Sequence, residues 1–207
     1  MDTIIEGIIA AVISYAVPWA LKRVLPDRAP GSAFPWLAWV LALAFGGGLG
    51  GIISGLIGLS FEGFGNWGIF GMCLGIMGWI VTQRMGIGPW FAAASALGWM
   101  VTPVFQSMGL GNAAWAIAGL LVGLLQWPAL QGKVRGAFWW VPASMVAWLA
   151  GGLLGLGVGM AIVGSDFVIA WVLGWTVVGG VGGLVLAPVL GWLWNRPTLA
   201  AAAGPQG

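Results

Sequence analysis

Three glutamines are the best-placed polar side chains in this very apolar sequence. Gln83, Gln126 and Gln131 lie within or at the ends of long apolar segments, and Gln126 lies deepest. An amide in a membrane interior needs a hydrogen-bond partner, so these residues are candidates for bonds between helices. We favour such bonds, with contacts along a solute pathway or with a ligand as the alternative. Nothing in their spacing resembles a set of catalytic acids, bases or nucleophiles.

Two tryptophans are the second candidate site. Trp99 and Trp148 follow Trp90 and Trp139 at the same spacing, about 13 Å further along a helix and near the middle of a membrane. An indole N–H at that depth needs an acceptor. We favour packing of these rings against glycine, with stacking on a bound ring system as the alternative.

Most of the other tryptophans fit an aromatic belt at the membrane surfaces. Of the sixteen in the chain, nine fall near predicted boundaries: Trp19, Trp36, Trp67, Trp90, Trp115, Trp139, Trp140, Trp192 and Trp194.

The inventory of side chains argues against an enzyme. The chain has no histidine, which removes histidine triads, histidine-ligated haem and histidine zinc sites. Cys73 is the only cysteine, so no intrachain disulfide forms. The glycine runs lack the Gly-Lys-Ser/Thr of a phosphate loop, and the last apolar segment has no lysine for a retinal Schiff base. We predict a protein without catalytic residues or a metal site.

Composition places the chain in a membrane. Of its 207 residues, 60% are hydrophobic and only 6% are charged, whereas soluble domains carry roughly 25% charged residues. Long apolar runs without alternation favour helices over barrel strands. The basic residues form no cluster large enough for a nucleic-acid partner. The prediction is an all-α integral membrane protein.

Seven segments are predicted to span the membrane: 3–21, 34–59, 67–83, 89–106, 112–131, 137–163 and 166–194. With this count, all seven basic residues fall on one side: Lys22, Arg23, Arg28, Arg84, Lys133, Arg135 and Arg196. Basic short loops mark the cytoplasmic face. We therefore expect a bacterial inner-membrane protein with its N-terminus outside and its C-terminus cytoplasmic. An interfacial first segment would leave the basic face unchanged.

The segments after the first form a tandem repeat. The pair Gly71-x3-Gly75 recurs as Gly119-x3-Gly123 and as Gly179-x3-Gly183. Before each pair lies an aromatic pair at one spacing: Trp36 with Phe45, Trp90 with Trp99, and Trp139 with Trp148. The predicted organisation is an N-terminal helix and basic loop (1–33), three parallel two-helix units (34–84, 89–132 and 137–195) and a disordered tail (196–207).

Glycine forms ridges on several of these helices, because residues four apart share one face. The ridges comprise Gly47, Gly51, Gly55, Gly71, Gly75, Gly119, Gly123, Gly151, Gly155, Gly159, Gly179 and Gly183. In lipid, such small-residue faces allow close backbone contact between helices. We expect them to pack the units together. The alternative is a groove for a flat apolar ligand such as a carotenoid, a quinone or a lipid tail, or for a partner helix.

One motif resembles a known group of proteins. The unit Gly-x3-Gly-x2-Gln-Trp at residues 119–127, followed by a basic loop and Trp139-x4-Ser144-x3-Trp148, resembles a repeat in uncharacterised multi-spanning bacterial membrane proteins. The resemblance covers the second unit well, the first in part, since Gly78 replaces the glutamine, and the third poorly. It implies a membrane location and no particular activity.

These observations favour a non-catalytic subunit or scaffold of a larger membrane complex. Its partners would be other membrane subunits and lipids, and lipid, carotenoid or quinone are the candidate ligands. The alternative is a small transporter or channel, with Gln83, Gln126 and Gln131 near its path.

Overall fold

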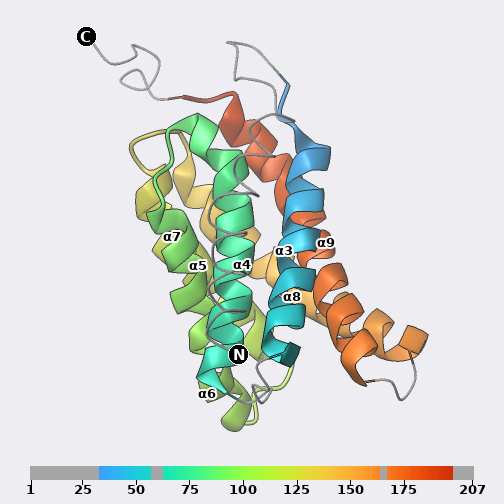
Figure 1. Ribbon diagram of the computed structural model, residues 1–207. Coiled ribbons are helices and arrows are strands. Elements are labelled where there is room, and N and C mark those ends of the chain that lie inside the picture. Colours follow the sequence, from blue (N-terminus) through green and yellow to red (C-terminus); the bar gives the residue numbers. More distant parts are fainter. Residues whose placement is uncertain (1–32, 57–62, 164–166, 198–207) are drawn as a thin grey trace, which may run out of the picture. The chain divides into compact units, whose positions relative to one another are not determined.

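The computed structural model describes residues 33–56, 63–163 and 167–197, and this part of the chain is helical. Its elements, shown in Figure 1, are α3 (Trp36–Leu56), α4 (Phe64–Thr82), η2 (Gln83–Met85), α5 (Trp90–Met100), α6 (Thr102–Ser107), α7 (Ala113–Leu130), η3 (Ala137–Trp139), α8 (Trp140–Val163) and α9 (Phe167–Trp194). The predicted first span and all but the first two residues of the tail lie outside the described residues.

Five helical segments are long and apolar enough to cross a membrane: Trp36–Ser54, Phe64–Met85, Ala113–Leu130, Ala137–Gly155 and Val172–Trp194. They correspond to five of the predicted spans, which confirms the all-helical membrane class. Their uniformly apolar surfaces suit burial in lipid on one side and in the protein on the other.

The span predicted at 89–106 is not one continuous helix. It is divided at Val101 into α5, of 11 residues, and α6, of 6 residues. Pro103 lies at the start of α6, where a missing N–H is tolerated. Inside a continuous helix the same proline would remove a hydrogen bond and crowd the preceding turn, so the break has a local cause.

The helices close into a ring. Among the described elements, α3 packs on α4, α4 on α5, α5 on α7, α7 on α8 and α8 on α9, and α9 returns to α3. In Figure 1, α3, α5 and α8 run in one direction and α4, α7 and α9 run in the other. The first and last helices of the described region are therefore neighbours, and Phe34 touches Trp194 with ring centroids 5.6 Å apart.

One type of glycine contact occurs at three places around this ring. Each joins the first glycine of a Gly-x3-Gly pair to a backbone carbonyl of the facing helix: Gly71 of α4 to Ser95 of α5, Gly119 of α7 to Ser144 of α8, and Gly179 of α9 to Leu43 of α3. A methyl group added at Gly71 or Gly119 would lie 2.6 Å from that oxygen. Only glycine permits this approach, which brings the two backbones together.

Aromatic rings fill the middle of the ring of helices. Every helix except α3 and α6 contributes to one connected cluster, which comprises Trp67, Phe70, Trp99, Trp115, Trp148 and Trp175. On its inward face α3 carries glycines instead: Gly50 packs on Phe70, and Gly51 packs on Trp175. The core is therefore a packed set of rings, as expected for close-packed protein interiors.

The single cysteine offers a test of this core. Cys73 of α4 is 4% exposed, and we expect it to react with a thiol-reactive maleimide at least about tenfold more slowly in folded protein than after denaturation. Labelling kinetics in mild detergent, with and without dodecyl sulfate, would measure this. Equal rates in both conditions would contradict the position of α4. Because no other thiol is present, the same reaction reports unfolding in variants.

Candidate functional site

Gln126 lies at the centre of a polar network inside the ring. Its Nε2 donates to the carbonyl oxygen of Phe91 and to the hydroxyl of Ser95, each at 3.2 Å. Its Oε1 accepts a 2.8 Å hydrogen bond from the indole N–H of Trp140. Residues of α5, α7 and α8 are thus held by one buried amide, 3% exposed. The expected bonds between helices are present.

A small cavity adjoins this amide. Its volume is about 10 Å³, and it is lined by Trp39, Leu43, Leu74, Phe91, Ser95, Gln126, Trp140, Trp148 and Leu186. That is close to the minimum for one water molecule and far below the size of an organic ligand. The space beside Gln126 therefore suits at most one water.

The other two glutamines lie apart from this network. Gln83 is half-buried in η2, where its Nε2 donates to the carbonyl oxygen of Ile80 at 2.9 Å. This bond stays within one turn of the chain and joins no second helix. Gln131 follows α7 and is exposed. The three glutamines do not line a common path among the described residues.

Trp99 and Trp148 are both buried, at 0% and 3% exposure, and their rings meet edge to face with centroids 5.1 Å apart. Trp99 also stacks on Trp67, with an interplanar angle of 13°. The rings therefore stack on other side chains and on glycine, and no space for a second ring system lies between them. Neither indole N–H has a hydrogen-bond acceptor among the described residues.

The aromatic belt was predicted wrongly at four positions. Trp67, Trp115, Trp140 and Trp194 are buried, at 0%, 4%, 1% and 3% exposure. The belt prediction used only distance along the chain, and these helices are apolar on all sides, so the face was not determined. Four other members of the predicted belt are exposed at the basic end: Trp36, Trp90, Trp139 and Trp192.

A longer motif was missed in the sequence. The glycine pairs are each preceded by a tryptophan four residues earlier, and the three tryptophans are Trp67, Trp115 and Trp175. All three are in the central cluster and contact one another. The motif is therefore Trp-x3-Gly-x3-Gly, in which the ring points to the centre and the glycines contact the next helix.

The aromatic pairing of the first unit also differs. Phe45 is 52% exposed, whereas Trp99 and Trp148 are buried. In the three glycine contacts, Leu43 takes the place of Ser95 and Ser144. The residues four positions earlier are then equivalent: Trp39, Phe91 and Trp140. Trp39 and Trp140 meet at 6.1 Å, and the Trp39 N–H donates to the Gly183 carbonyl oxygen at 3.0 Å.

The glycine ridges are covered by neighbouring helices. Gly47 faces the backbone of Trp175, while Gly151 and Gly155 face Val178 of α9. A methyl group on Gly151 would lie 2.8 Å from the Val178 carbonyl oxygen. Gly75, Gly123 and Gly183 likewise meet the facing helix. These faces leave no room for a flat ligand. The surroundings of Gly55 and Gly159 lie outside the description.

Trp140 and Trp148 differ in whether the indole N–H is hydrogen-bonded, so replacing them by phenylalanine should lower stability by different amounts. In Trp140→Phe, the Gln126 Oε1 loses its donor, whereas Trp148→Phe removes an N–H that has no partner. An acceptor left unsatisfied costs about 1–3 kcal/mol. We expect Trp140→Phe to lower the unfolding temperature, followed by Cys73 labelling, more than Trp148→Phe does. A larger loss in Trp148→Phe would show that its N–H has a partner.

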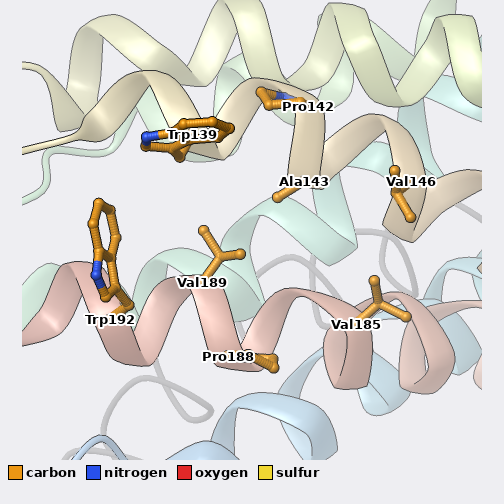
Figure 2. Close-up of a pocket in the computed structure, with 8 residues that line it drawn as sticks. All are labelled: Trp139, Pro142, Ala143, Val146, Val185, Pro188, Val189 and Trp192. Carbon is orange, nitrogen blue, oxygen red and sulfur yellow. The ribbon is translucent and has the colours of Figure 1, made fainter.

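The outer surface carries a much larger hollow between α8 and α9. This groove has a volume of about 590 Å³ and is lined by Trp139, Pro142, Ala143, Val146, Val185, Pro188, Val189 and Trp192. Figure 2 shows Trp139 and Trp192 at one end and Val146 and Val185 at the other. The lining is apolar apart from the two indole N–H groups.

Two basic residues, Arg135 and Arg196, lie near the tryptophan end of this groove. Arg135 and Arg196 are joined by a 2.7 Å hydrogen bond from the Arg135 N–H to the Arg196 carbonyl oxygen, and Val134 pairs with Pro197. The guanidinium of Arg196 lies 4.1 Å from the ring centre of Trp192. The described residues include four basic side chains and none of the five acidic ones. No group of three metal-ligating side chains is found among them.

The chain matches no protein-family model, no curated protein and no solved structure. The resemblance of residues 119–127 to a bacterial membrane repeat therefore adds no activity, and function has to be argued from the geometry.

Proposed function

We propose that this protein is a non-catalytic integral membrane subunit or scaffold that works through its outer surface. The observation that carries the proposal is the packed centre of the ring, where six aromatic rings and the Gln126 network occupy the interior. A protein whose middle is filled in this way offers binding surfaces mainly to lipid and to neighbouring proteins. Its apolar exposed side chains suit both.

We further propose that the ring consists of three parallel two-helix units related by an axis along the membrane normal. The three glycine contacts at Gly71, Gly119 and Gly179, together with three equivalent tryptophans, support this organisation. With α5 and α6 counted as one crossing, the ring has six crossings, and segment 3–21 would add a seventh. The repeat then creates a closed ring rather than an open stack.

The proposed orientation places the basic end in the cytoplasm of a bacterial inner membrane. Arg84, Lys133, Arg135 and Arg196 follow the ends of α4, α7 and α9, which lie at the same end of the ring in Figure 1. Basic residues in short loops favour the cytoplasmic side. If segment 3–21 crosses the membrane, the N-terminus lies outside.

A small transporter or channel is the second candidate, and one observation favours it. The indole N–H of Trp148, which lines the cavity beside Gln126, has no partner among the described residues, and neither do the buried indole N–H of Trp99 and the hydroxyl of Ser144. Such atoms are unusual in a packed interior and can mark a hydrated path. A path would require the aromatic cluster to move, because the cavity has room for about one water.

Extraction from the native membrane in a mild detergent tests the proposal. Native mass, co-purifying proteins and visible absorption would be recorded on the same sample. We expect a defined assembly larger than the 21.4 kDa chain, and a pigment band would identify a carotenoid or quinone-like ligand. A lone, colourless particle with solute flux after reconstitution would overturn the subunit proposal in favour of transport.

A further inference from the structure

The groove between α8 and α9 has the length and the apolar lining to hold part of a lipid acyl chain. From Trp139 of η3 to Val146 of α8, and from Val185 to Trp192 of α9, it extends along about two helical turns, roughly 10 Å. Its volume of about 590 Å³ falls within the usual range of ligand pockets. Val146 is 51% exposed, so the groove opens to the surroundings of the ring along its length.

The corresponding tryptophan of the preceding unit is bonded to the neighbouring helix. Trp90 of α5, which matches Trp139, donates its indole N–H to the Leu125 carbonyl oxygen of α7 at 2.9 Å. That bond draws the Trp90 ring across the junction of the two helices. Trp139 makes no comparable bond to α9 within the described region and is 59% exposed. The two helix pairs therefore differ in whether this tryptophan is tied to the neighbouring helix.

Two cations lie at the tryptophan end of the groove. Trp192 packs on Gly136, whose φ of 81° is the left-handed conformation that glycine allows. The guanidinium of Arg196 lies over the Trp192 ring. The backbone bond between Arg135 and Arg196 fixes these two exposed residues beside each other. No acidic side chain is present among the described residues to neutralise them.

We infer that this groove binds one acyl chain of an anionic phospholipid, whose phosphate is held by Arg196 and Arg135. The apolar lining takes the chain, the indoles of Trp139 and Trp192 lie at the headgroup level, and the guanidinium groups supply planar N–H donors that suit phosphate oxygens. Basic pockets between membrane helices on the cytoplasmic side recognise anionic headgroups in this way. The inference deepens the proposed membrane role and rests on the orientation proposed above.

Native mass spectrometry of the purified full chain tests the inference without any partner protein. Detergent-solubilised protein would be titrated with dioleoylphosphatidylglycerol and, separately, with dioleoylphosphatidylcholine. We expect the first lipid to bind more tightly, and Arg196→Gln to weaken it by about fivefold, the effect of one surface cation. Lys133→Gln is the matched control, because it removes the same charge from the same end, away from the groove lining.

A second variant tests the groove itself. Ala143→Trp would fill the space between α8 and α9, and we expect it to reduce binding of both lipids, while Cys73 labelling reports that the variant is folded. Equal binding of the two lipids, or full binding of phosphatidylglycerol to Arg196→Gln, would overturn the inference. Neither result depends on whether a protein partner co-purifies, so the site and the subunit proposal fail or survive separately.

Discussion

Leucine in place of Gly155 is expected to prevent recovery of folded protein, whereas leucine in place of Gly157 on the same helix is expected to be tolerated. A first side-chain carbon at Gly155 would lie 2.5 Å from the Val178 backbone N, while one at Gly157 meets no atom within 4 Å. Overpacking commonly costs about 1–3 kcal/mol, and backbone cannot move aside as a side chain does. Size-exclusion chromatography of both variants after mild extraction measures the difference.

The comparison of these two positions is well matched. Both are glycines of α8, and both substitutions add the same apolar side chain, so expression and insertion should change alike. Gly157→Leu also removes a residue of low helix propensity, worth up to about 1 kcal/mol in favour of the variant. Equal loss of folded protein in the two variants would refute the tight contact between α8 and α9.

The second large effect is expected at Gln126. Gln126→Leu should lower the free energy of unfolding by about 1–3 kcal/mol, because the Trp140 N–H loses its acceptor inside the ring. Leu186 of α9 is the repeat equivalent of Gln126 and is buried. A leucine side chain therefore fits at the equivalent position of another helix. Thermal unfolding followed by Cys73 labelling would measure the change.

A double-mutant cycle separates the hydrogen bond from packing. Trp140→Phe combined with Gln126→Leu should cost less than the sum of the two single changes, since both partners are then removed. Gln131→Leu, at an exposed amide, should change stability by no more than about 0.5 kcal/mol. Strict additivity would refute the bond. Loss of a solute flux without loss of stability in Gln126→Leu would support the transport alternative.

The elements that the sequence predicted well are those with strong local signals. Glycines in a left-handed conformation lie in two of the described turns: Gly86, with φ of 74°, ends η2, and Gly136, with φ of 81°, precedes η3. Long apolar runs between such turns can be identified as helices from their length and composition alone, once the surroundings are taken to be a membrane. The interruption at Val101 was missed because Pro103 is surrounded by apolar residues that continue the hydrophobic run.

The positions of the aromatic rings could not be predicted in the same way. In a soluble helix, polar residues mark the outer face, but these helices are apolar all round, so Trp36 and Trp39 look alike in the sequence. One is 56% exposed and the other 1%. The choice between them is made by the position of α9, whose Gly183 carbonyl oxygen accepts from the Trp39 N–H.

The candidate site was predicted in part. The need of Gln126 for a partner follows from its position in an apolar segment, and the bonds to Ser95 and Trp140 supply it. The identity of those partners depends on the order of helices around the ring, which no local pattern gives. The groove between α8 and α9 was missed for a similar reason, because its lining comes from two segments far apart in the chain, 139–146 and 185–192, that meet only when the helices pack.

The contact between α3 and α9, which closes the ring, can form only late in synthesis of the chain. Trp39 and the Gly183 carbonyl that it binds are 144 residues apart. At a synthesis rate of about 5–20 residues per second, Gly183 is made roughly 7–30 s after Trp39. Throughout that interval, the glycine face at Gly47 has no cover from α9, and bare backbone of this kind readily pairs with any other helix. Until α9 is made, the glycine face of α3 is therefore open to pairing with other helices.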